Sequence, residues 1–261
     1  MTYFLLTSCV VLLYGVVALG AYGQQALGRW RRLGLALLTL LALLGHAYLL
    51  QQGIDLPQGQ NLNVANLFSL IAWLAGFILF LGQCSLPITS LGLLVYPIAA
   101  FSLLLSLHAT NRFIVVTSEH PWALFHILWS TLVVGLFVIS GCQALLLALQ
   151  ERLLRAKKLT GFLERLPPLQ VMETVLFNCI KWGVLTLSLL LLSSFLLFKR
   201  SHLPGVWSKM LLGIAVWSVF IVLLLGRHFL GWRGNLAVAW TVSGVILSVG
   251  VYLGSHFLLL I

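Results

Sequence analysis

Charge is scarce in this sequence. Only 8% of its 261 residues are Asp, Glu, Lys or Arg, whereas 61% are hydrophobic. A soluble domain has roughly 25% charged residues, so this chain cannot cover its own surface in water. Lipid is the solvent in which such an apolar surface is stable. The shortage of charge therefore predicts an integral membrane protein.

Carboxylates are scarcer still, and their positions argue against hydrolytic chemistry. None of the five lies inside the apolar part of a long hydrophobic run, so no intramembrane pair is available for general acid–base catalysis. The sequence has no Ser/His/Asp arrangement, no His-Glu-x-x-His and no P-loop. We therefore expect a protein that is not an enzyme.

Paired cysteines and nucleic-acid-binding patterns are also missing. The four cysteines form no Cys-x-x-Cys, which excludes a thiol-redox motif and the Cys-x-x-Cys-His of covalent haem attachment. We expect them to pack as small apolar residues. The net charge is +10, and the basic residues lie mostly between the apolar runs. They form no basic stripe interleaved with aromatic residues, so no nucleic-acid partner is expected.

Apolar runs of about 20 residues, the length that crosses the roughly 30 Å hydrocarbon core as a helix, recur along the whole chain. A spanning backbone must satisfy its own hydrogen bonds, so each run is predicted to be a helix. The fold class is an all-α polytopic membrane helix bundle, a single transmembrane domain over 1–261. The N-terminal run lacks a basic segment and a cleavage site, so it is expected to be retained. The eight predicted spans are 3–22, 33–52, 64–84, 86–107, 122–149, 175–198, 209–227 and 236–258.

The basic residues between the spans predict an orientation. If the spans alternate, eleven of the fifteen share one side, and only Arg112, Lys199, Arg200 and Lys209 lie on the other. The positive-inside rule then places both termini outside, on the periplasmic side. The basic connection 150–171 lies inside, with apolar residues that suggest an amphipathic segment on the membrane. It is either a solvated loop that sets the topology or a docking site for a partner.

Histidines gather towards the predicted outer side. Six of the seven lie there, and only His228 is on the inner side. Several are compatible with ordinary interfacial residues. His46 and His126 differ, because each lies within an apolar span, where an ionisable residue is costly and is a functional candidate. Imidazole is a standard axial ligand of haem iron, so these two are candidate ligands of one iron.

Tryptophans and cations accompany these histidines. Trp122 and Trp129 near the same surface form either an aromatic belt at the lipid interface or an apolar platform for a porphyrin. Arg112, together with Lys199 and Arg200, could pair with haem propionates.

Several segments resemble the cytochrome c assembly membrane proteins, and in particular the YpjD-type, HemX-like inner-membrane branch of that family. Gly-Trp-Arg-Gly at 231–234 is the most specific of them, and the resemblance extends over most of the chain from His46 onward. The other matching segments are 62–68, 126–132, 143–152, 166–173, 226–230 and 252–255.

The resemblance implies haem handling at the outer face of a bacterial inner membrane. By position, His126 matches an outer haem-ligand histidine of the family, His228 matches a histidine near the inner end of the penultimate helix, and His46 lies near a membrane histidine of this branch. The tryptophan-rich signature of the synthase members is missing, and 199–207 stands in its place. His256 lies near, but not at, the usual place of the second outer histidine.

The resulting hypothesis is a multi-pass inner-membrane protein that binds or passes haem at the outer leaflet, without synthase chemistry. Its candidate cofactor-binding residues are His126, His46, His228, His256, Trp129, Trp122 and Arg112. The alternative is a haem-free accessory or transport-associated protein that acts through another inner-membrane protein. A haem lyase with a degenerate site is the third possibility.

Overall fold

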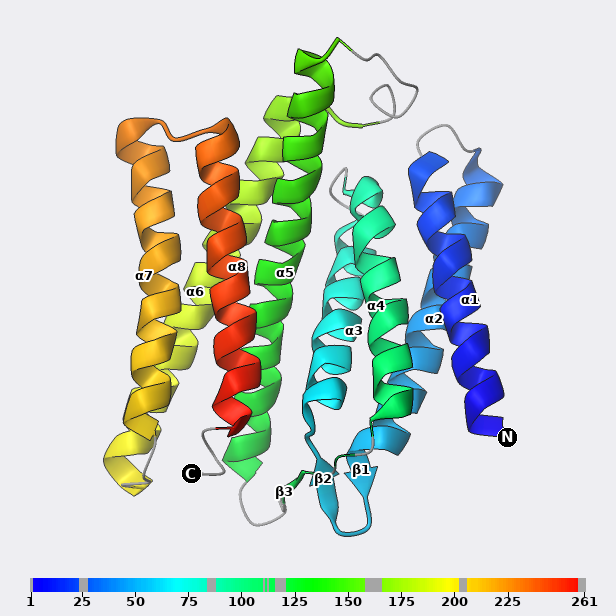
Figure 1. Cartoon of the computed structure of the whole chain (residues 1–261), viewed down its shortest axis with the longest axis vertical. Coiled ribbons are helices and arrows are strands. Elements are labelled where there is room, and N and C mark those ends of the chain that lie inside the picture. The colour runs from blue at the N-terminus through cyan, green and yellow to red at the C-terminus, as the bar shows by residue number, and fades with distance from the viewer. Residues whose placement is uncertain are drawn as a thin grey trace. The chain divides into compact units, whose positions relative to one another are not determined.

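The computed structural model describes residues 2–23, 28–83, 88–109, 111, 113–115, 121–157, 166–201 and 206–257, without the side chains at some helix ends. Within these residues the chain forms eight helices that are long and apolar enough to cross a membrane. This confirms the predicted all-α polytopic fold (Figure 1). The helices are α1 (Thr2–Gly23), α2 (Arg29–Ile54), α3 (Val64–Gly82), α4 (Gly92–His108), α5 (Pro121–Arg155), α6 (Leu169–Ser201), α7 (Val206–Leu230) and α8 (Gly234–Phe257).

Several helices exceed their predicted spans, and α5 and α6 do so the most. α5 continues to Arg155 and α6 already begins at Leu169, so both ends of the predicted 150–171 loop are helical. Glu151 and Arg155 pair across one turn of α5, which favours helix there. The central part of that loop, 158–165, lies outside the described residues, as does 84–87 in the predicted tight connection after α3. A short 3₁₀ helix, Thr89–Leu91, precedes α4.

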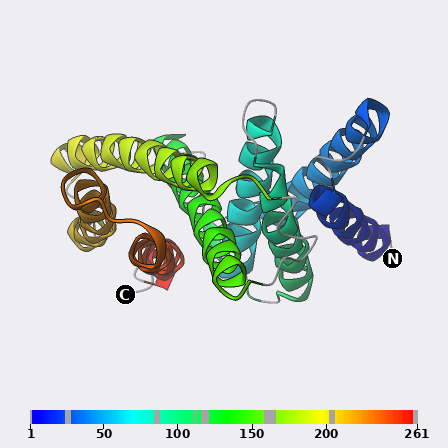
Figure 2. The same cartoon turned by 90° about the horizontal axis from the view of Figure 1, so that it is seen from above.

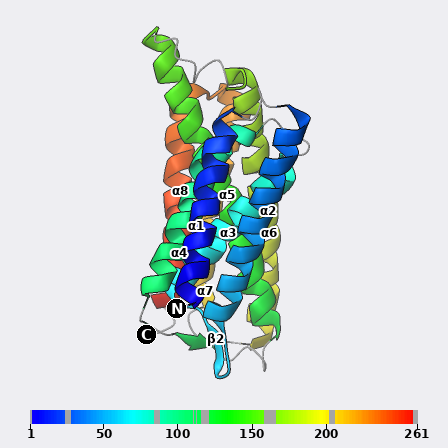
Figure 3. The same ribbon diagram turned by 90° about the vertical axis from the view of Figure 1, so that its right-hand side faces the viewer.

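The backbone divides into two compact units. Unit 1 comprises Met1–Leu124 with Leu159–Pro167, and unit 2 comprises Phe125–Lys158 with Pro168–Ile261. The hydrophobic spans in the sequence did not indicate this division. That residues 1–261 form a single transmembrane domain stays a prediction. In unit 1, α1 packs against α2 and α4, and α3 packs against α2 and α4 (Figure 3). In unit 2, α7 and α8 are seen nearly end-on from above, whereas α6 crosses them at an incline (Figure 2).

Unit 1 also has a small sheet that the sequence did not predict. Strands β1 (Asp55–Leu56), β2 (Gly59–Asn61) and β3 (Ile114–Val115) pair antiparallel in the order β1-β2-β3. The sheet lies at the end of unit 1 where α2 ends and α3 begins (Figure 1). Strands of two or three residues are too short to give an alternating hydrophobic pattern.

Asparagines connect this sheet to the helices. Asn63 caps α3 by accepting a hydrogen bond from the backbone N–H of Asn66 at 2.7 Å. The Asn66 amide donates to the carbonyls of Gly53 (3.0 Å) and Asn61 (2.9 Å) and accepts from Ser106 (2.8 Å). Segment 62–68 therefore fixes the entry to α3 against α2, β2 and α4.

We expect Asn66→Ala to destabilise unit 1. The substitution removes three hydrogen bonds from a buried side chain and leaves their partners unpaired, at about 1 kcal/mol for each bond or about 3 kcal/mol in all. Thermal unfolding of the purified protein in detergent measures the effect. The exposed Gln52→Ala is the matched control and should leave the midpoint unchanged. Equal midpoints for the two variants would contradict this role of Asn66.

Candidate functional site

His46 lies in the centre of unit 1 and is fully buried. Its Nδ1 is 3.0 Å from the hydroxyl of Tyr14 on α1, and its Nε2 is 2.9 Å from the hydroxyl of Ser69 on α3. Ser102 on α4 adds a longer contact of 3.5 Å to Ser69, and its hydroxyl also donates to the carbonyl of Ala99. Either neutral tautomer of the imidazole satisfies both of its bonds. Polar side chains from four helices thus meet at His46.

This environment bears directly on the proposed iron-binding role of His46. Both ring nitrogens already have hydrogen-bond partners, and the ring of Tyr14 packs edge-on against the imidazole at 5.7 Å between centroids. An axial bond to iron would require one of these hydrogen bonds to break. His46 belongs to unit 1 and His126 to unit 2, so the predicted pairing of the two on one iron stays a prediction.

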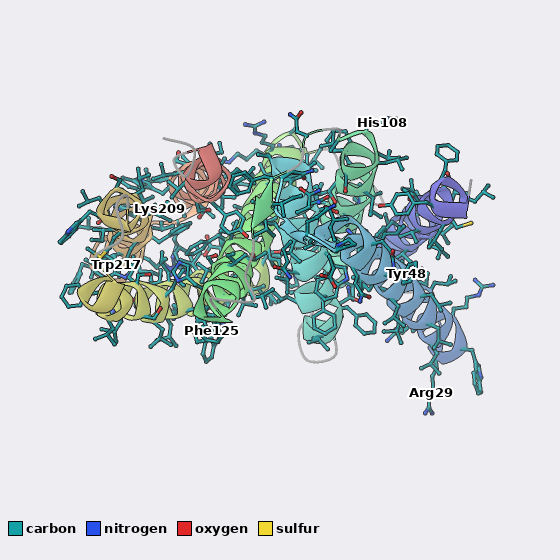
Figure 4. All side chains as sticks on the ribbon, turned by 90° about the horizontal axis from the view of Figure 1, so that it is seen from below. Arg29, Tyr48, His108, Phe125, Lys209 and Trp217 are labelled. Atoms are coloured by element: carbon teal, nitrogen blue, oxygen red, sulfur yellow. The ribbon has the colours of Figure 1, made fainter. Side chains whose placement is uncertain are left out.

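His126 is half-buried, one turn from the beginning of α5. Lys209 on α7 lies close enough to act on it electrostatically, although the two residues are far apart in sequence. Figure 4 labels Lys209 and also Phe125, which is half-exposed and points away from the other helices of unit 2. His126 therefore has a cation within electrostatic range.

The register of α5 and α8 places the backbone of a second histidine, His256, at the same height along the helix axes as His126. Thr131 on α5 hydrogen-bonds Tyr252 on α8, and a Cβ at Gly141 would lie 3.2 Å from Val245, so the two helices run antiparallel. His126 lies five residues beyond Thr131, and the backbone of His256 lies four residues beyond Tyr252, or about 7.5 and 6 Å at the rise of an α-helix. The two backbone positions are thus level with each other.

These residues form what we term the histidine end of unit 2: His126, Lys209, Thr131, Tyr252 and the backbone position of His256. Trp129 lies beside it, with its indole N–H donating to the carbonyl of Thr186 on α6 at 3.1 Å and its ring 5.1 Å from that of Phe125. Arg112 and the side chains of Trp122 and His256 lie outside the described residues. The sequence placed Lys209 among the outer cations and Tyr252 in a matching segment, but it assigned neither to the site, since only the packing of α5, α7 and α8 brings them to His126.

His228 lies at the opposite end of unit 2. It is exposed in the last turn of α7, 19 residues after Lys209 and therefore about 28 Å along the helix axis. His228 and His126 thus cannot bind one iron together. Among the described residues, no group of three or more His, Cys, Asp or Glu side chains is placed to hold a metal ion, which leaves ligation by one or two imidazoles as the metal chemistry to consider.

Charged side chains gather at this end of unit 2, which we term the arginine end: Glu151, Glu173, Arg227 and Arg233. Arg227 donates to Glu173 at 3.3 Å and to the carbonyl of Trp232 at 3.2 Å, and its guanidinium lies 4.7 Å from the centre of the Phe177 ring. Glu173 also accepts from the backbone N–H of Gly234 at 3.4 Å. The carboxylate therefore holds the ends of α6, α7 and α8 together.

Gly-Trp-Arg-Gly forms the turn from α7 to α8 at the arginine end. Gly231 and Gly234 have φ values of +65° and +56°, which favour glycine. The Trp232 ring stacks on Trp240 at 5.6 Å. Segment 143–152 reaches the same place, because the Gln143 amide donates to the carbonyl of Met172 at 2.9 Å. Four segments on which the resemblance rests therefore meet at this end of unit 2: 143–152, 166–173, 226–230 and 231–234.

The described helices define a multi-pass helical membrane protein. The family model described as cytochrome c assembly protein matches residues 5–261, and the chain belongs to this family. It is 31% identical over 240 residues to the inner membrane protein YpjD of Escherichia coli K12, which covers 89% of this chain and 88% of that protein. The YpjD proteins of E. coli O6:H1 and O157:H7 match equally well. No solved structure is significantly similar. The protein is a multi-pass protein of the bacterial inner membrane.

Proposed function

We propose that the protein binds haem at the histidine end of unit 2 and passes it on in cytochrome c assembly, without forming the thioether bonds itself. The observation that supports this most is the level placement of His126 and His256 on antiparallel helices, with Lys209 nearby. Bound haem would supply an iron that takes one or two imidazole ligands. The distribution of Lys and Arg supports an outer position for this end, because eleven of the fifteen lie on the opposite side if the spans alternate.

The residue types at this end fit such a group. His126 offers an imidazole, Trp129 and Phe125 offer aromatic surface, and Lys209 offers a cation for a propionate. In this proposal His126 is an axial ligand, and His46 is a packing residue because both of its ring nitrogens are already bonded.

We expect His126→Ala to remove most of the Soret absorbance of the purified protein, because it deletes an iron ligand. His228→Ala is the matched control, since it deletes an exposed histidine at the arginine end, and it should leave the Soret band unchanged. Spectra are compared at equal protein concentration after addition of haemin.

Two outcomes would contradict the proposal. Equal Soret bands for His126→Ala and the unaltered protein would remove His126 from the site. An unaltered chain that binds no haem would instead favour the haem-free accessory role, in which the protein acts through another inner-membrane protein.

A further inference from the structure

A groove of about 410 Å³ runs between α6 and α7 at the arginine end of unit 2. Lys181 and Asn178 line it from α6, and Arg227 and His228 line it from α7. Phe177 and Leu224 give it an apolar wall. It lies at the opposite end of unit 2 from His126, so it is separate from the proposed haem site.

The charge in this groove is unbalanced. Its lining includes two cations, Lys181 and Arg227, and no carboxylate. Glu173 binds Arg227 from outside the lining and offsets one positive charge, which leaves that of Lys181. A neighbouring pocket has a different balance, since its lining pairs Glu151 and Glu173 with two arginines. The α6–α7 groove is therefore the one that favours an anion.

The same face of α6 becomes apolar beyond Lys181. The exposed residues Leu185, Leu189 and Leu192 follow at spacings of four, four and three, which keeps them on one side of the helix. This apolar stripe extends for about 16 Å from Lys181 at the rise of an α-helix, close to the roughly 15 Å of half the hydrocarbon core. Trp182 is 63% exposed beside Lys181, as is typical of the membrane interface.

A cationic site that continues into an apolar stripe as long as one leaflet fits an amphiphile with an anionic headgroup. We propose that this groove binds an anionic phospholipid, with its phosphate at Lys181 and Arg227 and an acyl chain along Leu185, Leu189 and Leu192. The exposed amide of Asn178 provides a neutral hydrogen-bond donor for the headgroup. Basic pockets between membrane helices bind such headgroups through the same charge complementarity.

Native mass spectrometry of the full chain in mild detergent tests the proposal with phosphatidylglycerol and phosphatidylcholine of identical acyl chains. We expect the unaltered protein to retain one phosphatidylglycerol more tightly than phosphatidylcholine. Lys181→Gln should weaken the phosphatidylglycerol complex roughly fivefold, the effect of about one basic residue near a lipid surface, and Lys181→Arg should restore it. Lys181 is exposed, so these variants are expected to fold.

The matched control is Arg152→Gln, which removes an exposed cation from α5 outside the groove and should leave lipid binding unchanged. An equal loss in Arg152→Gln and Lys181→Gln would show a general charge effect and overturn the site. So would unchanged binding in Lys181→Gln, or equal retention of the two lipids by the unaltered chain. Displacement of phosphatidylglycerol by millimolar inorganic phosphate would identify a site for free phosphate and contradict the lipid assignment.

Discussion

Gly183→Leu is expected to disrupt the packing of unit 2. The core of this unit is a pair of fully buried rings, Phe137 on α5 and Phe220 on α7, stacked at 4.0 Å between centroids. A Cβ at Gly183 would lie 2.5 Å from the Phe137 ring, and a Cβ at Gly244 would lie 2.7 Å from the Phe220 ring. The stacked partner limits how far either ring can move away from an added side chain. We expect a loss of about 3 kcal/mol or more from this overpacking.

The thermal unfolding midpoint in detergent measures this loss. Gly250→Leu on α8 is the matched control, since a Cβ at Gly250 meets none of the described atoms within 4 Å. The control should unfold close to the unaltered protein, whereas Gly183→Leu should unfold well below it. If both variants keep the original midpoint, helix contact through these glycines does not hold unit 2 together.

His46→Leu is the second substitution expected to have a large effect, here on unit 1. Leucine is close in volume to histidine, so the substitution removes the hydrogen bonds without opening a large cavity. The hydroxyl of Tyr14 loses the imidazole, and Ser69 loses its 2.9 Å partner, in a region without exposure to water. Leaving such a group unsatisfied costs about 1–3 kcal/mol, and we expect a lower unfolding midpoint.

The double variant His46→Leu/Tyr14→Phe provides a sharper test. It removes the Tyr14 hydroxyl, one of the two hydroxyls that lose the imidazole in His46→Leu, and replacing both partners of a hydrogen bond by apolar groups is nearly neutral. The double variant should therefore unfold at a higher temperature than His46→Leu alone. It should also keep the haem-binding capacity of the unaltered protein. If the double variant is no more stable than His46→Leu, the packing role of His46 is contradicted. If the double variant no longer binds haem, His46 is a haem ligand after all.

His46 shows why hydropathy could locate a residue but not assign its role. An ionisable side chain inside an apolar span is costly wherever it lies, and the sequence therefore made His46 a functional candidate. Its partners Tyr14 and Ser69, and Ser102 that contacts Ser69, come from three other helices. Pairings between helices are not visible in the hydropathy of any one helix. The eight spans themselves were predictable, because lipid requires each crossing to be a long apolar helix.

The matching segments show a similar limit. Glu173 and Gly-Trp-Arg-Gly are adjacent in space because the carboxylate binds Arg227 and the N–H of Gly234. Their positions in the sequence indicated a family, but the structure shows that they stabilise helix ends at the arginine end. The sequence placed Lys209 only among the outer cations, and it enters the candidate site because α7 brings it near His126.

The haem content of the purified full-length protein tests the central proposal most directly. The absorption spectrum after addition of haemin gives the ratio of bound haem to chain. Binding at the histidine end predicts about one haem per chain in the unaltered protein and in His228→Ala, and little in His126→Ala. A chain that stays colourless with added haemin, or that binds equal haem in all three proteins, would contradict it.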